Sequence, residues 1–324
     1  MKNIGIKGLG SYVPDFIVSN EDLSKIVDTD NEWIVERTGI NTRRISKNED
    51  TSDIAYKASL KALKDANLRG EDLDLIIVAT ISPDKFVPSV ACILQDKLNA
   101  QDAACFDISV ACSGFVYGIE IAKSMMMVNG YKNALVIGAE VLSKLIDWKD
   151  RSTCVLFGDG AGACILQEGC DRGVVKRSYL RALGSKSSAL EVGARDLDSP
   201  FAESIIKKDP FIRMNGREVF KFAVNAMREA ILKALEYNDE KLENIKFIIP
   251  HQANKRIITY TAKKLNLDID KFFINIDRVA NTSAASEPIA LCECYEKNLI
   301  KKGDKIILVA FGGGLTYAST LIEW

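Results

Sequence analysis

The chain repeats a pattern of residues at a fixed offset, and this repeat limits the folds open to it more than any other feature. The tetrapeptide Leu-Lys-Ala-Leu occurs at 60–63, ahead of an apolar run at 75–80, and again at 232–235, ahead of another at 247–251. A shared offset of about 172 over roughly 80 residues indicates two similar halves. Duplicated halves usually place an active site where they face each other, so we expect both to contribute to the chemistry.

Short apolar runs alternate with longer amphipathic stretches. The runs have strand length and are apolar on both faces, while stretches such as 53–68 and 218–237 have helical spacing. Sheets built from such strands are covered by helices, so the predicted fold class is α/β. Gly130 and Gly303 each close a helix before a strand at nearly the same offset, which predicts a boundary near residue 172. The runs lie at 75–80, 134–140, 154–160, 247–252 and 306–314.

Charge and composition exclude several classes of protein. The 324 residues carry 43 Lys and Arg against 44 Asp and Glu, so no overall positive field is available to hold nucleic acid. No run approaches the roughly 18 apolar residues of a membrane-spanning helix, and the N-terminus lacks the apolar core of a secretion signal. The 8 cysteines lie mostly in apolar strings, as buried free thiols of a reducing compartment do. We therefore expect a cytoplasmic protein that binds neither nucleic acid nor membrane.

Cys112 is the first candidate for catalytic chemistry. It lies in ACSGF, between a strand-like stretch and a helical one, so the positive end of a helix dipole should lower the pKa of its thiol. The alternative is a buried structural cysteine, the commonest role of a free cysteine. Cys292 and Cys294 lie within one helical stretch without a spaced partner pair, so we expect no metal site there.

Three further segments offer polar groups near the ends of predicted elements. His251, in HQAN, is the one histidine of the chain, so any imidazole chemistry must use it, although a lone histidine is more often structural. Asn281, in NTSAAS, either caps the following helix or presents its amide to a ligand. The closing glycines 312–314 either supply an amide N–H to an oxyanion hole or form a plain turn.

A glycine-rich stretch at 157–162, FGDGAG, suggests a rival function. A nucleotide-binding protein built around it would bind NAD or ATP and would not depend on Cys112. The stretch is followed by no Lys-Ser or Lys-Thr, which rules out a P-loop, and it comes too late in the chain for a first Rossmann turn.

Cys112, His251 and Asn281 in their motifs, followed by FGGG, resemble the beta-ketoacyl-[acyl-carrier-protein] synthase III family, the initiating condensing enzymes of bacterial type II fatty-acid synthesis. The resemblance covers essentially the whole chain and implies a thiolase-like fold, with two pseudo-repeated α/β halves, 1–172 and 173–324, whose mixed sheets are covered by helices. Elongating relatives use two histidines, and biosynthetic thiolases carry a second cysteine near their closing glycines. This chain has neither.

The resemblance implies a ping-pong reaction with acyl-CoA as substrate and no metal or redox cofactor. Cys112 takes the acyl group while the amides of Cys112 and Gly313 hold the oxyanion. His251 and Asn281 then donate hydrogen bonds to malonyl-acyl-carrier protein as it loses carbon dioxide. The residues implied to bind CoA are Thr29, Trp33, Arg37, Arg151, Phe220 and Asn254.

The resemblance also implies protein partners. An acidic acyl carrier protein would dock on Lys255 and Arg256, and a second copy of the chain would form a homodimer in which Phe86 and Val87 close the acyl pocket of the partner. The alternative is a synthase-III-like acyltransferase of a secondary-metabolite pathway, of polyketide or alkylquinolone type, that uses another acceptor.

The chain departs from the family pattern at a few positions. Arg217 stands where relatives often carry Asn, Ala280 where Gly commonly precedes the catalytic Asn, and Glu287 where an apolar residue is usual. The segment 185–213 is longer than in some relatives and is expected to cover the tunnel or the dimer edge.

Overall fold

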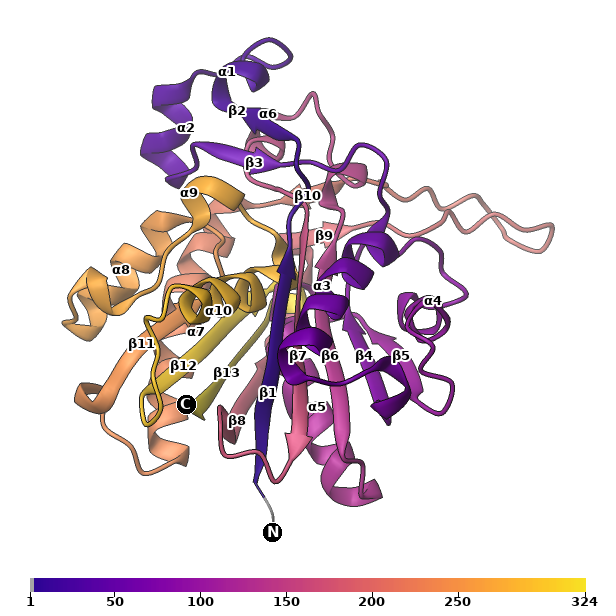
Figure 1. Ribbon diagram of the computed structural model, residues 1–324. Coiled ribbons are helices and arrows are strands. Elements are labelled where there is room, and N and C mark those ends of the chain that lie inside the picture. Colours follow the sequence, from indigo (N-terminus) through magenta and orange to yellow (C-terminus); the bar gives the residue numbers. More distant parts are fainter. Residues whose placement is uncertain (1–2) are drawn as a thin grey trace.

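One nine-stranded sheet runs through the computed structural model, which describes residues 3–324 (Figure 1). Its strand order is β11-β12-β13-β8-β1-β7-β6-β4-β5, and two small sheets pair β2 with β3 and β9 with β10. The strands are β1 (Ile4–Tyr12), β2 (Ile17–Ser19), β3 (Thr42–Arg44), β4 (Leu75–Ala79), β5 (Ala104–Ile108), β6 (Asn133–Glu140), β7 (Gly160–Glu168), β8 (Val174–Ala182), β9 (Leu190–Val192), β10 (Ile212–Met214), β11 (Ile245–Pro250), β12 (Lys305–Gly312) and β13 (Thr316–Glu323).

The same series of strand pairings occurs twice in the large sheet. In the first half β4 pairs with β6 in parallel, and β6–β7 and β7–β1 are antiparallel. In the second half β11 pairs with β12 in parallel, and β12–β13 and β13–β8 are antiparallel. The halves meet where β1 pairs with β8. The boundary at 172/173 falls in the turn between β7 and β8, and the division into two domains there stays a prediction.

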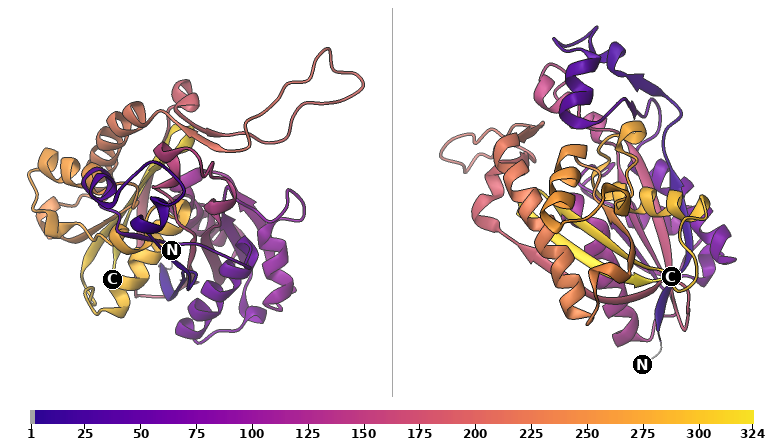
Figure 2. Two further views of the ribbon diagram at one scale, coloured as in Figure 1. Left: turned by 90° about the horizontal axis from the view of Figure 1, so that it is seen from above. Right: turned by 90° about the vertical axis from the view of Figure 1, so that its left-hand side faces the viewer.

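Two helices lie between the halves, and the others cover the outer faces or form a cap (Figures 1 and 2). Helix α5 (Gly114–Asn129) contacts β4 and β6 of the first half and β12 and β13 of the second, and α10 (Ser286–Glu296) likewise touches strands of both. Buried Phe115 and Leu291 from these helices share one core with Ile77 and Leu308. Because α5 is apolar on nearly all sides, it is stable only when covered on both faces.

The remaining helices build the outer layers and a cap. Helices α3 (Thr51–Ala66) and α4 (Val90–Lys97) pack on the first half, and α7 (Gly216–Tyr237) and α8 (Lys255–Leu265) belong to the second. The cap contains β2, β3, α1 (Asn20–Leu23), α2 (Asn31–Thr38), α6 (Arg151–Cys154) and α9 (Ile276–Val279). Short 3-10 turns are η1 (Gly70–Asp72), η2 (Ala111–Ser113), η3 (Leu142–Lys144), η4 (Gly184–Ala189), η5 (Leu242–Asn244), η6 (Ile269–Lys271), η7 (Ser283–Ala285) and η8 (Gly313–Leu315).

The segment 185–213 forms an arm that projects from the body (Figures 1 and 2). It leaves through β9 and returns through β10, and Leu197 and Ile206 form an antiparallel bridge part of the way out. Phe201 is 94% exposed. Leu190, Val192 and Ile212, on β9 and β10 at the base of the arm, border a cavity described below, whereas Leu197, Phe201 and Ile206 farther out border neither cavity described below.

Two expectations for local elements are wrong. The run 154–160 is not a strand, because α6 occupies its start and β7 begins only at Gly160. Gly130 does end α5 in a left-handed conformation, but α10 ends at Glu296, so Gly303 lies in the turn before β12. Within residues 3–324, no helix has the length and apolar character needed to cross a membrane.

Candidate active site

Cys112 lies in η2, at the turn that enters α5, as its motif predicts. The preceding Ala111 is held in the left-handed region at φ 45°. Gly312, at the end of β12, passes directly against Cys112, since a Cβ on this glycine would lie 2.7 Å from the Cys112 main-chain nitrogen. Only glycine allows that approach. The close contact brings an element of the second half onto a residue of the first.

The expectation that the helix dipole lowers the thiol pKa is wrong for this site. Burial raises the pKa of Cys112 to about 12, with Glu287 and Glu140 also raising it and only Ser283 and the Cys112 main chain lowering it. Loss of water around a fully buried thiolate outweighs the partial charge of a helix end. Of the other cysteines, Cys92 is exposed and lies with its sulfur 3.3 Å from that of Cys105, without a disulfide.

His251 follows β11 and is buried as a neutral imidazole. Its main-chain N–H donates to Val309 O at 2.8 Å, its Nδ1 lies 3.0 Å from Ser286 Oγ, and burial lowers its pKa to about 3. Thr282 Oγ1 donates to Ser286 Oγ at 3.4 Å, so the Ser286 proton is free to point at Nδ1. With the Ser286 hydroxyl donating to Nδ1, the imidazole proton lies on Nε2, where it can donate to a ligand.

Asn281 has one end of its side chain fixed and the other free for a ligand. Its Oδ1 accepts from the Ser283 main-chain N–H at 2.9 Å, two residues on, and α10 begins only at Ser286. Because a main-chain N–H can only donate, the atom facing it must be the amide oxygen. The Nδ2 group therefore remains as a donor beside the cavity that Asn281 borders.

The glycine-rich stretch 157–162 supports Asn281 and α10. Gly158 N–H donates to Asn281 O at 2.9 Å, and the Asp159 carboxylate accepts from the Ser143 N–H at 2.9 Å. A Cβ at Gly162 would come within 2.6 Å of Pro288 on α10. The glycines thus serve helix packing and not the phosphate cradle that the nucleotide-binding alternative needs.

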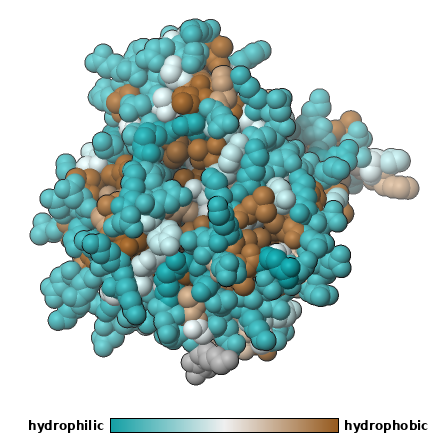
Figure 3. All heavy atoms as spheres, in the orientation of Figure 1, coloured by the Kyte–Doolittle hydropathy of each residue, from teal (hydrophilic) through white to brown (hydrophobic). Residues whose placement is uncertain are grey.

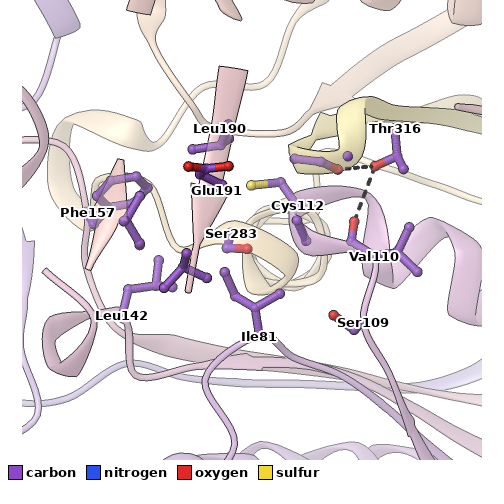
Figure 4. Close-up of a pocket in the computed structure, with 15 residues that line it drawn as sticks. Ile81, Ser109, Val110, Cys112, Leu142, Phe157, Leu190, Glu191, Ser283 and Thr316 are labelled. Atoms are coloured by element: carbon purple, nitrogen blue, oxygen red, sulfur yellow. Dashed lines mark hydrogen bonds between the residues drawn. The ribbon is translucent and has the colours of Figure 1, made fainter. Parts of the chain in front are cut away.

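Two cavities meet at Cys112, and both are bordered by Phe157 and Leu190 as well. The first, called here the Trp33 cavity, has a volume of about 260 Å³ and brings Cys112, His251 and Asn281 to one space. The second, the Ile81 cavity, measures about 250 Å³ (Figure 4). A substrate in the first cavity can therefore place a reacting carbon at Cys112 and extend a chain into the second.

Four of the six residues implied to bind CoA border the Trp33 cavity, namely Trp33, Arg37, Phe220 and Asn254. Arg151 does not, but its guanidinium lies 5.1 Å from the Trp33 ring centre, and that of Arg37 lies 4.8 Å from it. Thr29 lies outside the cavity lining, with its hydroxyl buried and without a partner among residues 3–324. The amide of Asn254 caps α8 and donates to Arg37 O at 3.0 Å.

The Ile81 cavity is bordered by apolar residues that the sequence did not single out. Phe86 and Val87 are not among them, and both are exposed, at 73% and 84%. Gly313 does border this cavity. Arg217, where the chain differs from the family pattern, is exposed on the first turn of α7 and borders neither the Trp33 cavity nor the Ile81 cavity. The lining residues not named from the sequence are Ile81, Leu142, Leu190, Val192 and Ile212. Leu190 and Val192 alternate on β9, and with Ile212 they lie in the segment 185–213 that the sequence did single out, whereas Ile81 and Leu142 come from separate segments.

Two regions of the chain match models of one protein family. Residues 106–184 match the family described as 3-Oxoacyl-[acyl-carrier-protein (ACP)] synthase III, and residues 235–324 match its C-terminal region. The chain is 58% identical over the full length of both chains to Beta-ketoacyl-[acyl-carrier-protein] synthase III of Clostridium beijerinckii, and 51% identical to that of Clostridium acetobutylicum, with 100% of this chain and 99% of the relative covered.

A solved structure shows the same fold. The 3-oxoacyl-[acyl-carrier-protein] synthase III of Aquifex aeolicus superposes with a TM-score of 0.92 at 46% identity, over 99% of this chain and 100% of that one. The fold is thus thiolase-like, as expected. With full-length relatives above half identity and Cys112, His251 and Asn281 bordering one cavity, the chain belongs to the beta-ketoacyl-[acyl-carrier-protein] synthase III family.

Proposed function

We propose that the protein joins an acyl-CoA primer to malonyl-acyl-carrier protein by a decarboxylating Claisen condensation, the first carbon–carbon bond of fatty-acid synthesis. The observation that carries this proposal is the single cavity bordered by Cys112, His251 and Asn281. A nucleophile and two neutral hydrogen-bond donors at one point suit a reaction that forms an acyl-enzyme and then an enolate.

In the first half-reaction Cys112 attacks the thioester carbon and CoA leaves as the thiol. The acyl chain then extends into the Ile81 cavity, whose apolar walls favour a hydrocarbon chain. The main-chain amides of Cys112 and Gly313 are proposed to hold the oxyanion, since the segment after Gly312 passes against Cys112.

In the second half-reaction the malonyl thioester occupies the Trp33 cavity and loses carbon dioxide. His251 through Nε2–H and Asn281 through Nδ2–H donate to the thioester oxygen as it gains negative charge. A neutral imidazole suits this task because it keeps its proton while the donated bond strengthens. The resulting carbanion attacks the acyl group on Cys112 and releases the beta-ketoacyl product.

We also propose that CoA lies along Trp33 and Arg37, with Arg151 and Thr29 at the nucleotide end and Phe220 and Asn254 along the arm. The two guanidinium groups on the Trp33 ring leave planar, cationic surfaces that suit adenine and phosphate. Arg256 and Lys255 begin α8 next to Asn254, so a carrier protein docked there would deliver its prosthetic arm into the same cavity.

A homodimer completes this proposal. Phe86 and Val87 are exposed, and so are apolar side chains on the arm, which projects to the right in Figure 3 and carries brown spheres. Soluble proteins normally cover such apolar surface. Strand β5 is the edge of the large sheet and offers unpaired main-chain groups to a second copy.

The function is tested by intact and peptide mass spectrometry after incubation with a panel of acyl-CoAs, followed by malonyl-acyl-carrier protein. We expect one acyl group on Cys112, none on C112S, and transfer to the carrier in the second step. H251A and N281A should still acylate but lose decarboxylation. Condensation by either variant at the wild-type rate would contradict the roles given to these residues.

The alternative, a secondary-metabolite acyltransferase, differs in the acceptor alone. It would load Cys112 but leave malonyl-acyl-carrier protein unchanged, so the second step of the same experiment separates the two.

A further inference from the structure

Within residues 3–324, one hydrogen bond orients the Asn281 side-chain amide, and it comes from a strained residue. The Ser283 main-chain N–H donates to Oδ1 at 2.9 Å, which leaves Nδ2 as the free donor beside the Trp33 cavity. Ser283 is buried and has φ 48°, in the left-handed region that a residue with a Cβ rarely adopts. Strained backbone of this kind persists only where neighbouring groups fix it, so the contacts of Ser283 decide where its N–H points.

Glu140, the last residue of β6, holds the side chain of Ser283. It is fully buried, and its Oε1 accepts from Ser283 Oγ at 3.1 Å. Its other oxygen, Oε2, accepts from Thr80 Oγ1 at 3.0 Å, from Ser82 Oγ at 2.5 Å and from the Ser82 N–H at 3.1 Å. These bonds fix the carboxylate to the segment that follows β4. Burial raises the pKa of Glu140 to about 7, although the donors lower it.

Strand β6 brings this carboxylate to η7 by direct packing. A Cβ on Gly138 would lie 2.0 Å from Ala284 O, so the turn η7 rests on the strand at a glycine. Gly138 and Glu140 are two residues apart on β6 and therefore face the same side of the sheet. The Glu140 side chain thus meets Ser283 next to the point where η7 touches the sheet.

We propose that Glu140 is a positioning residue for the decarboxylation step and acts through Ser283 on Asn281. The carboxylate holds the Ser283 hydroxyl, the held residue keeps its strained backbone, and its N–H fixes the oxygen of the Asn281 amide. Nδ2 is thereby aimed at the malonyl thioester oxygen before that oxygen gains charge. A donor fixed in advance needs no rearrangement in the transition state, so its loss slows the reaction more than it weakens substrate binding.

Ser283→Ala is the cleanest variant for a test of this role. It removes one hydroxyl and leaves the bonds of Glu140 to Thr80 and Ser82 in place. In Glu140→Gln, those donors hold the amide oxygen, and the nitrogen that then faces Ser283 cannot accept its hydrogen bond. Because Ser283 also borders the Ile81 cavity beside Cys112 (Figure 4), acylation has to be measured separately from decarboxylation.

The test follows the two half-reactions at pH 8, above the pKa of Glu140. Acylation by acyl-CoA is read by intact mass spectrometry, and the loaded protein is then mixed with malonyl-acyl-carrier protein while carbon dioxide release is timed. We expect S283A to acylate within about twofold of wild type but to release carbon dioxide about 10- to 100-fold more slowly, with little change in KM for the carrier protein. E140Q should slow the same step. S59A, which removes another fully buried serine hydroxyl, on α3, is the matched control and should behave like wild type in both steps.

A double variant separates positioning of Asn281 from a general loss of structure. S283A combined with N281A should release carbon dioxide no more slowly than N281A alone, because Ser283 acts through the Asn281 amide. If S283A slows the N281A protein by the same factor as wild type, the proposal is overturned. It is also overturned if S283A decarboxylates within about threefold of wild type.

This inference rests on the proposed function, and the experiment separates the two. Wild-type protein that does not acylate at Cys112, or N281A that decarboxylates at the wild-type rate, would reject the proposed function itself. An impaired N281A beside an unimpaired S283A would reject the role of Glu140 alone. S283A gives this result even if E140Q does not fold.

Discussion

Ala280 holds a backbone conformation that favours glycine, immediately before Asn281. Its φ of 59° and ψ of −158° lie in a region from which a Cβ is normally excluded. Such a residue costs of the order of 1–3 kcal/mol and persists where its surroundings fix it. Here the fixing contacts are the Asn281 N–H to Leu156 O and the Gly158 N–H to Asn281 O.

The first prediction at this scale is that Ala280→Gly stabilises the protein. Relief of strain should outweigh the greater freedom of glycine in the unfolded chain and the loss of a buried methyl, giving a gain of about 1 kcal/mol. Urea denaturation measures this change in the free energy of unfolding. The control is Ala284→Gly, because Ala284 is a buried alanine of η7 whose φ is not positive. A280G less stable than wild type would show that the site is not strained.

Glu287 is the other unusual residue near the nucleophile. It is fully buried, both carboxylate oxygens lack a partner among residues 3–324, and burial holds its pKa well above the ordinary value. A group whose pKa is raised on folding contributes stability below its unfolded pKa, and that contribution is lost as pH rises above it.

Glu287→Leu should therefore become increasingly more stable than wild type from pH 5 to pH 8. The difference should grow by about 1.4 kcal/mol per pH unit until the pKa of Glu287 in the folded protein is reached. Urea midpoints of both proteins at several pH values measure it. The contributions of Glu140 and Asp159 cancel because both proteins keep them. A difference that does not change with pH would mean that Glu287 finds a partner or water.

At the scale of elements, α8 joins the proposed docking surface to the cavity. The side-chain amide of its N-cap residue, Asn254, donates to the main-chain carbonyl of Arg37. The Arg256 guanidinium lies 5.7 Å from the ring centre of Phe220, which borders the Trp33 cavity. Lys264 lies near the far end of the helix and donates to Asn225 Oδ1 at 2.8 Å. Helix α8 thus carries Arg256 near the Trp33 cavity and Lys264 at its far end.

Arg256→Glu should weaken the use of malonyl-acyl-carrier protein by about tenfold or more, because a like charge opposes an acidic partner. Cys112 acylation by acyl-CoA should change far less. Lys264→Glu, with the same change in charge, is the control and should affect neither step strongly. KM for carrier protein and the acylation rate are the two measurements. Equal losses in both would place Arg256 in CoA binding instead.

At the scale of the whole molecule, exposed apolar side chains lie at both ends of the first-half strands. Val87 follows the carboxyl end of β4 and is 84% exposed, and Val128, in the last turn of α5, is equally exposed at the opposite end. The two valines therefore differ in position and not in exposure.

Val87→Asp should convert the proposed dimer to monomer and slow acylation, because the partner would no longer close the acyl cavity. Val128→Asp should do neither. Light scattering during size-exclusion chromatography measures the molar mass of the protein in solution. Mass spectrometry measures the fraction of Cys112 that carries an acyl group. A wild-type protein that elutes at 35.7 kDa would reject the dimer.

The sequence alone determined the α/β class, the repeat and the identity of Cys112, His251 and Asn281 as candidates. Those features are local. An apolar run, a turn and a helix follow one another in the chain, and the candidate catalytic residue lies at the turn. The sequence also placed Arg256 at the start of a helix, and the family resemblance implied that Trp33, Arg37, Phe220 and Asn254 form one group. The structure brings these four to one cavity.

Only the tertiary structure decided what surrounds those residues. Burial reversed the expected pKa shift of Cys112, because dehydration depends on everything packed around the thiol and not on its neighbours in the chain. Contacts across the fold turned the glycines of 157–162 into packing positions against α10. Ile81 and Leu142 border the same cavity, and Glu140 contacts Ser283, through pairings between segments far apart in the sequence. No local pattern encodes such contacts, because they exist only once the two halves are packed together.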